Sequence, residues 1–237
     1  MMQTLRQSAK AFGLALSDHQ LAQFEAYWSY LQDRNRVMNL TAITERAEAI
    51  EKHFLDSLAL ATVADFDGKR LIDIGTGAGF PGLPLKIAVP GMALTLLDSL
   101  NKRVAFLEEI CQRLQLETVS CTHARAEEWV AAPGRRESYD YATGRAVAEM
   151  NVLLELCLPY VKIGGAFLAM KTVQAEEEIQ AAIPPMHILG GEMEARHTYV
   201  LPGSPNVARQ IVVVRKVAPT PAAYPRRFAK IQKQPLK

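Results

Sequence analysis

The chain has 237 residues, a formal net charge of +2, 49% hydrophobic residues and 22% charged residues. This composition is typical of a globular protein and excludes collagen-like, low-complexity and largely disordered chains. The length predicts one large domain with an appendage rather than a string of modules. Three scattered cysteines without a CxxC pair predict neither a disulfide framework nor a metal site. Since the apolar stretches are too short for a membrane span or a signal peptide, we expect a soluble, cytoplasmic protein.

Charge is distributed unevenly along the chain. Residues 195–237 carry nine cations and no Asp or Glu, so this segment is +9 and the rest of the chain is −7. A basic segment on an acidic body predicts a polyanionic partner, although such a segment is more often only a solvated surface. The nine cations are Arg196, Arg209, Arg215, Lys216, Arg226, Arg227, Lys230, Lys233 and Lys237.

Residues 1–67 are predicted to form a helical extension. Ser17 and Gln20 match a capping box, and the apolar residues that follow recur at the spacing of one helix face. A second helix is predicted over 45–63, where neither Gly nor Pro occurs. The polar turn Asn39-Leu40-Thr41 between them would cap the second helix or face a ligand.

Residues 68–218 are predicted to form an α/β domain. Short apolar runs alternate with helical patterns, which is typical of a doubly wound parallel sheet. Strands are expected at 71–74, 93–97, 119–121, 139–142 and 166–170, and helices at 83–89, 102–116 and 147–161. Two further strands, at 197–201 and 210–217, would close the sheet as a hairpin-like edge. The Pro-rich basic segment 219–237 is expected to be a mobile tail.

A glycine-rich loop follows the first predicted strand directly. It reads Asp73-Ile74-Gly75-Thr76-Gly77-Ala78-Gly79-Phe80-Pro81-Gly82. Glycines at a strand-to-helix turn let backbone N–H groups approach a ligand that any Cβ would push away. The same letters satisfy the dinucleotide fingerprint G-x-G-x-x-G, which is a weak signal by itself, so a nicotinamide cofactor is one alternative.

Two carboxylates bear on the choice of ligand. Asp98 ends the second strand, where a carboxylate suits the ribose of either a nicotinamide or an adenosyl cofactor. Asp73, beside the loop, suits a positively charged, amine-bearing methionine group better than a pyrophosphate. The chain also leaves no separate substrate domain of dehydrogenase size. We therefore favour S-adenosylmethionine over NAD.

These motifs together resemble the RsmG family, also called glucose-inhibited division protein B. The resemblance rests on the loop 73–82, LDSL-x-KRV-x-FL at 97–107, Asn39-Leu40-Thr41, HFLDS at 53–57, RAEE at 125–128, RAVA at 145–148, Met170-Lys171 and Tyr224-Pro225-Arg226. It implies a class I S-adenosylmethionine-dependent methyltransferase fold, Rossmann-like, with a mostly parallel sheet and an antiparallel last strand. It also implies methylation of a guanine N7 in 16S rRNA of the small ribosomal subunit.

The resemblance implies cofactor contacts at Gly75, Phe80, Ala126, Glu127 and Arg145. With the loop and strand-end residues, the expected cofactor site comprises Asp73, Gly75, Gly77, Gly79, Phe80, Asp98, Ala126, Glu127 and Arg145. Some of these residues have plainer explanations: Phe80 would pack in the core, Glu127 would favour a helix start, and Arg145 would form a surface ion pair. Arg145, however, follows a central strand, at the edge where such sheets bind ligands.

The residues around the fourth strand bear on the reaction. Thr143-Gly144-Arg145 stands where exocyclic-amine methylation usually requires a polar-Pro-Pro-aromatic motif, and the cysteines lie in helix or strand patterns, which disfavours carbon methylation. Guanine N7 has a free lone pair, so positioning and desolvation suffice without a general base. Arg145 and Lys171 are expected to position the substrate, with His53 and His123 as alternative bases. Arg145 cannot bind O6 and N7 together, because that would cover the methylated atom.

RNA contacts are expected at Arg125, Arg226, Arg227 and Lys230, because Lys and Arg bind phosphates irrespective of sequence. Tyr224 and Phe228 would stack on unpaired bases. The family usually places Gly and Pro after Tyr-Pro-Arg, where this chain differs. Removal of 219–237 is expected to weaken RNA binding and to spare cofactor binding. We expect a monomer that acts on 16S rRNA or the small subunit without a metal. A NAD(P)-dependent oxidoreductase and an RNA-binding protein without turnover are the alternatives.

Overall fold

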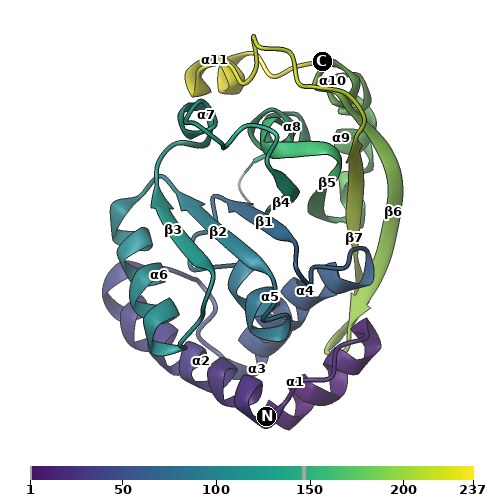
Figure 1. Ribbon diagram of the computed structural model, residues 1–237. Coiled ribbons are helices and arrows are strands. Elements are labelled where there is room, and N and C mark those ends of the chain that lie inside the picture. Colours follow the sequence, from purple (N-terminus) through teal and green to yellow (C-terminus); the bar gives the residue numbers. More distant parts are fainter. Residues whose placement is uncertain (1, 146–147) are drawn as a thin grey trace.

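The computed structural model describes residues 2–145 and 148–237, and its centre is a seven-stranded sheet (Figure 1). The strand order is β3-β2-β1-β4-β5-β7-β6. The strands are β1 (Arg70–Ile74), β2 (Ala93–Asp98), β3 (Val119–His123), β4 (Tyr139–Gly144), β5 (Val161–Thr172), β6 (Gly191–Leu201) and β7 (Ser204–Lys216). The strands β1 to β5 pair in parallel, whereas β7 runs antiparallel to β5 and β6. The predicted mostly parallel sheet with an antiparallel last strand is confirmed.

The sheet separates two layers of apolar side chains, because successive residues of a strand point to opposite faces. Leu71 and Val213 belong to one layer, and their neighbours Ile72 and Val212 belong to the other. The first layer is covered by α1 (Met2–Ala9), α2 (Asp18–Met38), α5 (Gly82–Ala88) and α6 (Asn101–Arg113). The second is covered by α7 (Ala126–Trp129), α8 (Met150–Cys157), α10 (Ile183–Ile188) and α11 (Phe228–Lys233). Figure 1 shows the sheet between these two groups of helices.

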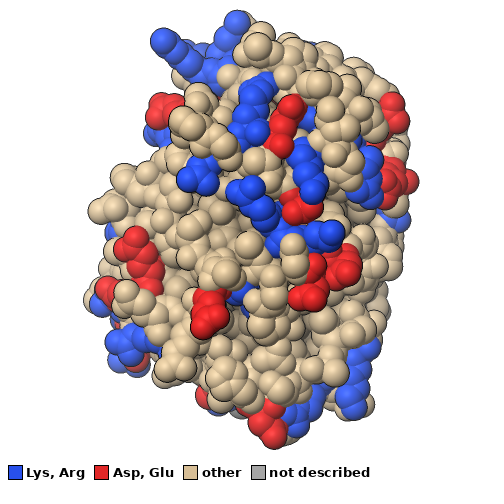
Figure 2. All heavy atoms as spheres, in the orientation of Figure 1, with Lys and Arg blue, Asp and Glu red and all other residues tan. Residues whose placement is uncertain are grey.

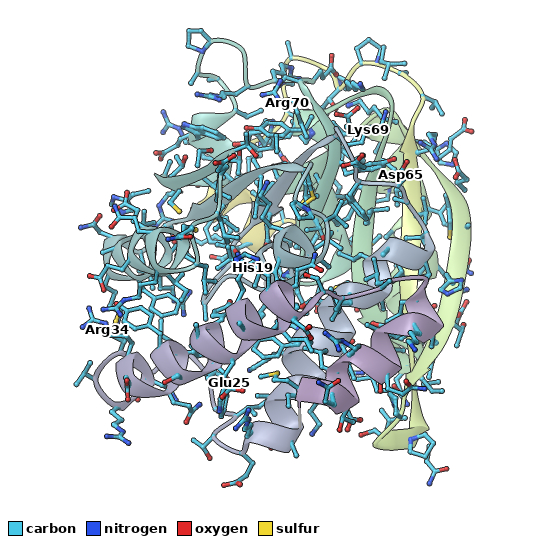
Figure 3. All side chains as sticks on the ribbon, turned by 60° about the horizontal axis from the view of Figure 1, so that its bottom comes forward. His19, Glu25, Arg34, Asp65, Lys69 and Arg70 are labelled. Atoms are coloured by element: carbon cyan, nitrogen blue, oxygen red, sulfur yellow. The ribbon has the colours of Figure 1, made fainter. Side chains whose placement is uncertain are left out.

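The N-terminal helices pack on the first layer. The helix α2 begins at the predicted capping box, in which Ser17 and Gln20 each accept from the other's backbone N–H. Figure 3 shows α1 and α2 from below, with His19, Glu25 and Arg34 along α2. The single helix predicted over 45–63 is wrong in detail. The segment is divided into α3 (Arg46–Ala49), a π-helical turn η2 (Ile50–Leu55), α4 (Asp56–Leu58) and a 3₁₀ turn η3 (Ala59–Thr62).

Several elements between β4 and β7 differ from the prediction. The closing hairpin is longer than expected, since β6 and β7 extend well beyond 197–201 and 210–217. The helices α9 (Glu176–Ala181) and α10 were not expected. The helix predicted over 147–161 is α8 followed by a 3₁₀ turn η4 (Leu158–Tyr160), and its first residue lies outside the described residues.

The C-terminal segment is folded onto the domain, so the expectation of a mobile tail is wrong. Arg136 donates to the Thr220 carbonyl, and Arg226 donates to the buried carboxylate of Glu155. Ile231 of α11 is wholly buried in the second apolar layer. Burial and charge pairing together offset the conformational entropy that a free tail would keep. The segment therefore lies along α7 and α8, at the top of Figure 1.

Phe54 of η2 packs against α2 and belongs to the first apolar layer. Its side chain is wholly buried, with ring centroids 5.0 Å from Phe24 and 5.5 Å from Tyr27. We predict that Phe54→Ala lowers the free energy of unfolding by about 3–5 kcal/mol, measured by urea denaturation. Val37→Ala, at a side chain that is 75% exposed, is the control and should change it by less than about 0.5 kcal/mol. Equal stability of the two variants would contradict the packing described for Phe54.

Candidate functional site

Two cavities open at the carboxyl ends of the strands, the edge at which parallel α/β sheets bind ligands. The loop cavity, of about 140 Å³, lies beyond β1, β2 and β3. It is lined by Ile74, Gly75, Leu97, Asp98, Ser99, Ala124, Arg125, Ala126, Glu127, Leu156 and Phe228. The cationic cavity, of about 430 Å³, lies between the ends of β4 and β5 and the N-terminal helices. Its polar lining includes Lys52, His53, Asp56, Arg145, Lys171, Thr172, Glu178, Tyr199 and Arg209.

The glycine loop turns under the loop cavity in a conformation that side chains would disturb. Gly77 and Gly79 have φ values of +62° and +101°. A Cβ on Gly79 would lie 2.4 Å from Leu83 Cδ1 and 2.7 Å from Tyr27 Oη, so only glycine fits. The Gly77 N–H donates to Asp98 Oδ2 at 3.0 Å, which ties the loop to the end of β2.

Asp73 supports the loop from beneath and lines neither cavity. Its side chain is wholly buried, and Oδ2 accepts from Thr76 Oγ1 at 2.7 Å and from Gly82 N at 2.8 Å. Burial raises the pKa of the Asp73 carboxyl to about 6. Its Oδ1 has no hydrogen-bond partner among the described residues. The structure thus gives Asp73 a positioning role in the loop and leaves one free acceptor atom beneath it.

Asp98 lines the loop cavity, as the sequence predicts for a ribose contact. Its Oδ1 accepts from Leu100 N at 2.9 Å, and its Oδ2 accepts from Gly77 N. Oδ2 also pairs with Arg103 Nη1 at 3.4 Å, so it is Oδ1 that keeps a second lone pair for a hydroxyl donor. Ala126 and Glu127, at the start of α7, form another part of the same cavity wall.

Arg145 is held at the end of β4 by residues of the N-terminal helices. Its Nη1 donates to Asp56 Oδ2 at 3.0 Å and to the Lys52 carbonyl at 2.9 Å. Its Cζ lies 5.3 Å from the centroid of Phe80. Phe80 itself is 6% exposed and packs in the first apolar layer, between the loop and the N-terminal helices. Arg145 therefore lines the cationic cavity in a fixed orientation and does not lie in the lining of the loop cavity.

Asp56 gathers the polar groups of the cationic cavity, and our sequence analysis did not single it out. It is 1% exposed. Besides Arg145, it pairs with Arg209 of β7 at 3.1 Å and accepts from Tyr199 Oη of β6 at 2.7 Å. The available signal was the motif HFLDS, which carries both His53 and Asp56. The partners on β6 and β7 have no such local signal.

His53 is neutral and both of its ring nitrogens are engaged. Burial, together with the adjacent Arg145, lowers the pKa of His53 to about 3. Because Arg145 Nη2 lies 3.3 Å from Nδ1, the proton resides on Nε2, which donates to Thr41 Oγ1 at 2.8 Å. The ring stacks on Phe80 with centroids 4.3 Å apart. The polar turn at Thr41 therefore positions His53, and this histidine is a poor general base.

Lys171 faces the cationic cavity with its ammonium group bound by the protein. Its Nζ donates to Glu178 Oε1 at 2.6 Å and to the Ala148 carbonyl at 3.1 Å. Four cationic side chains and two carboxylates line this cavity, so its charge favours an anion. His123, the other histidine considered as a base, is exposed near Ser99 and lines neither cavity.

The basic C-terminal fifth of the chain is largely paired with the acidic body. Five of its cations form ion pairs: Arg196–Glu176, Arg209–Asp56, Arg215–Glu194, Lys216–Glu137 and Arg226–Glu155. The expected RNA contact at Arg226 is therefore replaced by an anchoring contact within the protein. The remaining cations are exposed and form no ion pair within the described ranges: Arg227, Lys230, Lys233 and Lys237. Figure 2 shows Lys and Arg gathered in the upper part of this face, with Asp and Glu between them.

Metal and thiol groups do not mark either cavity. Across 2–145 and 148–237, no group of three or more His, Cys, Asp or Glu is arranged to hold a metal ion. In the same ranges, no helix is both long and apolar enough to cross a bilayer. The three cysteines lie outside both cavity linings, and burial raises the pKa of the Cys157 thiol.

The family model of rRNA small subunit methyltransferase G matches residues 20–202. The chain belongs to this family. Ribosomal RNA small subunit methyltransferase G of Lachnoclostridium phytofermentans is 47% identical over 234 residues, which cover 98% of this chain and 96% of the relative. Its namesake from Bacillus subtilis is 47% identical over 225 residues, covering 94% of each chain. The resemblance to the RsmG family is thereby confirmed.

Two solved structures share the fold of this rRNA small subunit methyltransferase G family member. A SAM dependent methyltransferase from Aquifex aeolicus aligns with a TM-score of 0.56 at 14% identity, covering 74% of this chain and 96% of that chain. TYW2 of M. jannaschii, in complex with AdoMet, aligns with a TM-score of 0.56 at 12% identity, covering 74% and 80%. These similarities confirm the predicted fold class.

The neutral state of His53 makes stability depend on pH. The unfolded chain binds a proton on this histidine below about pH 6.5, whereas the folded protein does so only near pH 3. Its contribution to stability is therefore present above pH 6.5 and is lost as the pH falls, by up to about 1.4 kcal/mol per pH unit. We predict that the stability difference between the wild type and His53→Asn shrinks from pH 7 to pH 5 in urea denaturation. Parallel pH profiles of the two proteins would contradict the neutral assignment.

Proposed function

We propose that this protein transfers a methyl group from S-adenosylmethionine to N7 of a guanine in 16S rRNA. The proposal is carried by family membership over nearly the whole chain, in which the curated relatives are named ribosomal RNA small subunit methyltransferase G. The two cavities support it, because they offer separate places for a nucleoside cofactor and an anionic substrate at the same sheet edge. The three proposed segments are an N-terminal extension (1–67), a catalytic domain (68–218) and a C-terminal segment (219–237).

The donor set of the loop cavity fits S-adenosylmethionine. The carboxylates of Asp98 and Glu127 line the loop cavity and accept hydroxyl and amine donors. Asp73 is buried beneath the loop, so its proposed contribution is to hold the loop through Thr76 and Gly82. The carboxylate of Asp73 directly beneath the loop disfavours a pyrophosphate there, and with it the dinucleotide alternative. When bound, the cofactor supplies an electrophilic methyl group on its sulfonium. Of the residues proposed for the cofactor site, Gly75, Asp98, Ala126 and Glu127 line the loop cavity. Asp73, Gly77 and Gly79 are proposed to shape the loop, and Phe80 and Arg145 to contact the cofactor from the side of the cationic cavity.

The cationic cavity suits a nucleobase whose reacting atom does not have to lose a proton. His53 is neutral with both nitrogens engaged, and Lys171 is bound to Glu178, so neither is a free base. Guanine N7 already carries a lone pair, and positioning and desolvation suffice for its attack on the methyl group. We assign the positioning to Arg145 and Lys171. Arg145 would contact O6 alone, a phosphate or the cofactor carboxylate, since bidentate binding would cover N7.

The RNA partner is proposed to lie along the exposed cations beside the loop cavity. Arg227, Lys230 and Lys233 project from α11 or its start, and Arg125 lies at the loop cavity. Phosphate contacts of this kind are independent of sequence and weaken with salt. The substrate would be 16S rRNA or the small subunit in the cytoplasm. We propose that the enzyme acts as a monomer, for which it suffices that one chain lines both cavities.

Methyl transfer from tritiated S-adenosylmethionine into 16S rRNA lacking the mark tests the activity, and chemical cleavage at N7-methylguanine locates the product. We predict that Arg145→Lys lowers kcat/KM by about 10–100-fold, because a lysine cannot span the Asp56, Lys52 and His53 contacts. Arg215→Lys, at an ion pair on the edge hairpin, is the control and should act like the wild type. Label on another base atom, or no label, would reject the proposed reaction.

The glycine loop provides a test of cofactor placement. We predict that Gly79→Ala reduces affinity for S-adenosylmethionine at least tenfold in titration calorimetry, because its Cβ would clash with Leu83 and Tyr27. Gly134→Ala is a matched control, since Gly134 also has a positive φ, of +72°, but nothing lies within 4 Å of its Cβ. Equal affinities of the two variants would place the cofactor elsewhere.

A further inference from the structure

We propose that Phe228 is a further cofactor-binding residue, and that residues 219–237, here called the C-terminal strap, form the outer wall of the adenine end of the loop cavity. This inference rests on the proposed function, because it takes S-adenosylmethionine as the ligand of that cavity. Phe228 lies 130 positions after Asp98 in the sequence, yet both residues line the loop cavity. The strap is therefore part of the cofactor site as well as a carrier of cations.

The surroundings of Phe228 fit a flat aromatic ligand. The apolar part of the cavity is formed by Phe228 together with Ile74, Leu97 and Leu156, while Glu127 offers an acceptor on the same wall. An aromatic ring among aliphatic side chains suits the stacking of a purine ring. An acceptor beside it suits the exocyclic amine of adenine. These features place the adenine, rather than the methionine end, next to Phe228.

Phe228 also separates the loop cavity from a second hollow. A space of about 420 Å³ between α7 and the strap is lined by Arg125, Glu127 and Phe228, which line the loop cavity as well. The guanidinium carbon of Arg125 lies 5.7 Å from the Phe228 ring centroid. Truncation of Phe228 would join the two spaces and let water reach the adenine end of the loop cavity.

The strap is fixed on both sides of Phe228. On one side, Arg226 donates to Glu155 through its backbone N and Nε at 2.8 Å each and through Nη2 at 2.7 Å. Glu155 and Ile231, which anchors the other side, are both wholly buried. Tertiary contacts on both sides therefore fix the position of the Phe228 ring.

The helix α11 divides its side chains by chemistry. Phe228 and Ile231 face the protein, whereas Lys230 and Lys233 are exposed. The sequence-based expectation that Phe228 stacks on RNA bases is accordingly revised, since its ring lines the loop cavity. The expectation that removal of the strap spares cofactor binding is revised for the same reason.

Equilibrium binding of the purified full-length protein tests the inference. In titration calorimetry, we expect Phe228→Ala to weaken binding of both S-adenosylmethionine and adenosine by about 5–30-fold, and by a similar factor, because the contact is to the adenine they share. Phe228→Leu keeps apolar bulk and should lose less. Gln234→Ala, at the exposed end of the same helix, should bind both ligands like the wild type. A loss for S-adenosylmethionine without a loss for adenosine would overturn the placement at the adenine end.

Trypsin provides a second readout that does not depend on activity. Binding couplings are reciprocal, so a ligand that contacts the strap must stabilise the strap in its docked position. We expect S-adenosylmethionine to slow cleavage after Arg227, Lys230 and Lys233 in the wild type, and to protect Phe228→Ala much less, as followed by intact mass.

The two proposals fail in different ways. Wild-type affinity of Phe228→Ala and Phe228→Leu for both ligands would overturn the inference and leave the methyltransferase assignment intact. Absence of S-adenosylmethionine binding by the wild-type protein would overturn both the inference and the proposed function.

Discussion

The carboxylate of Asp56 is the point at which three separate parts of the molecule meet. It lies on the N-terminal helices, pairs with Arg145 after β4 and with Arg209 of β7, and accepts from Tyr199 of β6. A buried carboxylate is stable only when it is paired and hydrogen-bonded, so these contacts are mutually required. They fix the N-terminal helices against the sheet and set the direction in which Arg145 faces the cationic cavity. The arrangement of the cationic cavity therefore follows from the pairing of the buried Asp56 carboxylate.

Glu155 has a corresponding role on the opposite face of the sheet. It lies in α8, is wholly buried, and binds the backbone and guanidinium of Arg226. The uneven charge of the chain has a structural role, because ion pairs of this kind bind the basic C-terminal fifth to the acidic body. Internal pairing consumes most of the cations, and those of α11 that remain exposed lie beside the loop cavity.

Local sequence patterns carried much of the fold and part of the site. The alternating strands and helices predicted the sheet, and the carboxyl ends of parallel strands necessarily meet at one edge. For that reason the glycine loop and Asp98, each at the end of a strand, were correctly expected to lie together. Asp73 was placed beside the loop correctly, but its burial directed it to Thr76 and Gly82 instead of a cavity. Burial of an individual side chain depends on the layers packed around it, which periodicity does not specify.

The sequence by itself determined the α/β order, the closing hairpin and the turn of the glycine loop, because hydrophobic periodicity and glycine conformation act over a few residues. Only the tertiary structure decided which charges pair and where the C-terminal segment lies. Asp56 and Tyr199 are 143 positions apart, and Glu155 and Arg226 are 71 apart. For each of these carboxylates, the sequence contains many cations that could have been its partner. The choice was made by the packing of helices on the two faces of the sheet, since a buried charge binds whichever partner the folded chain brings within hydrogen-bond distance.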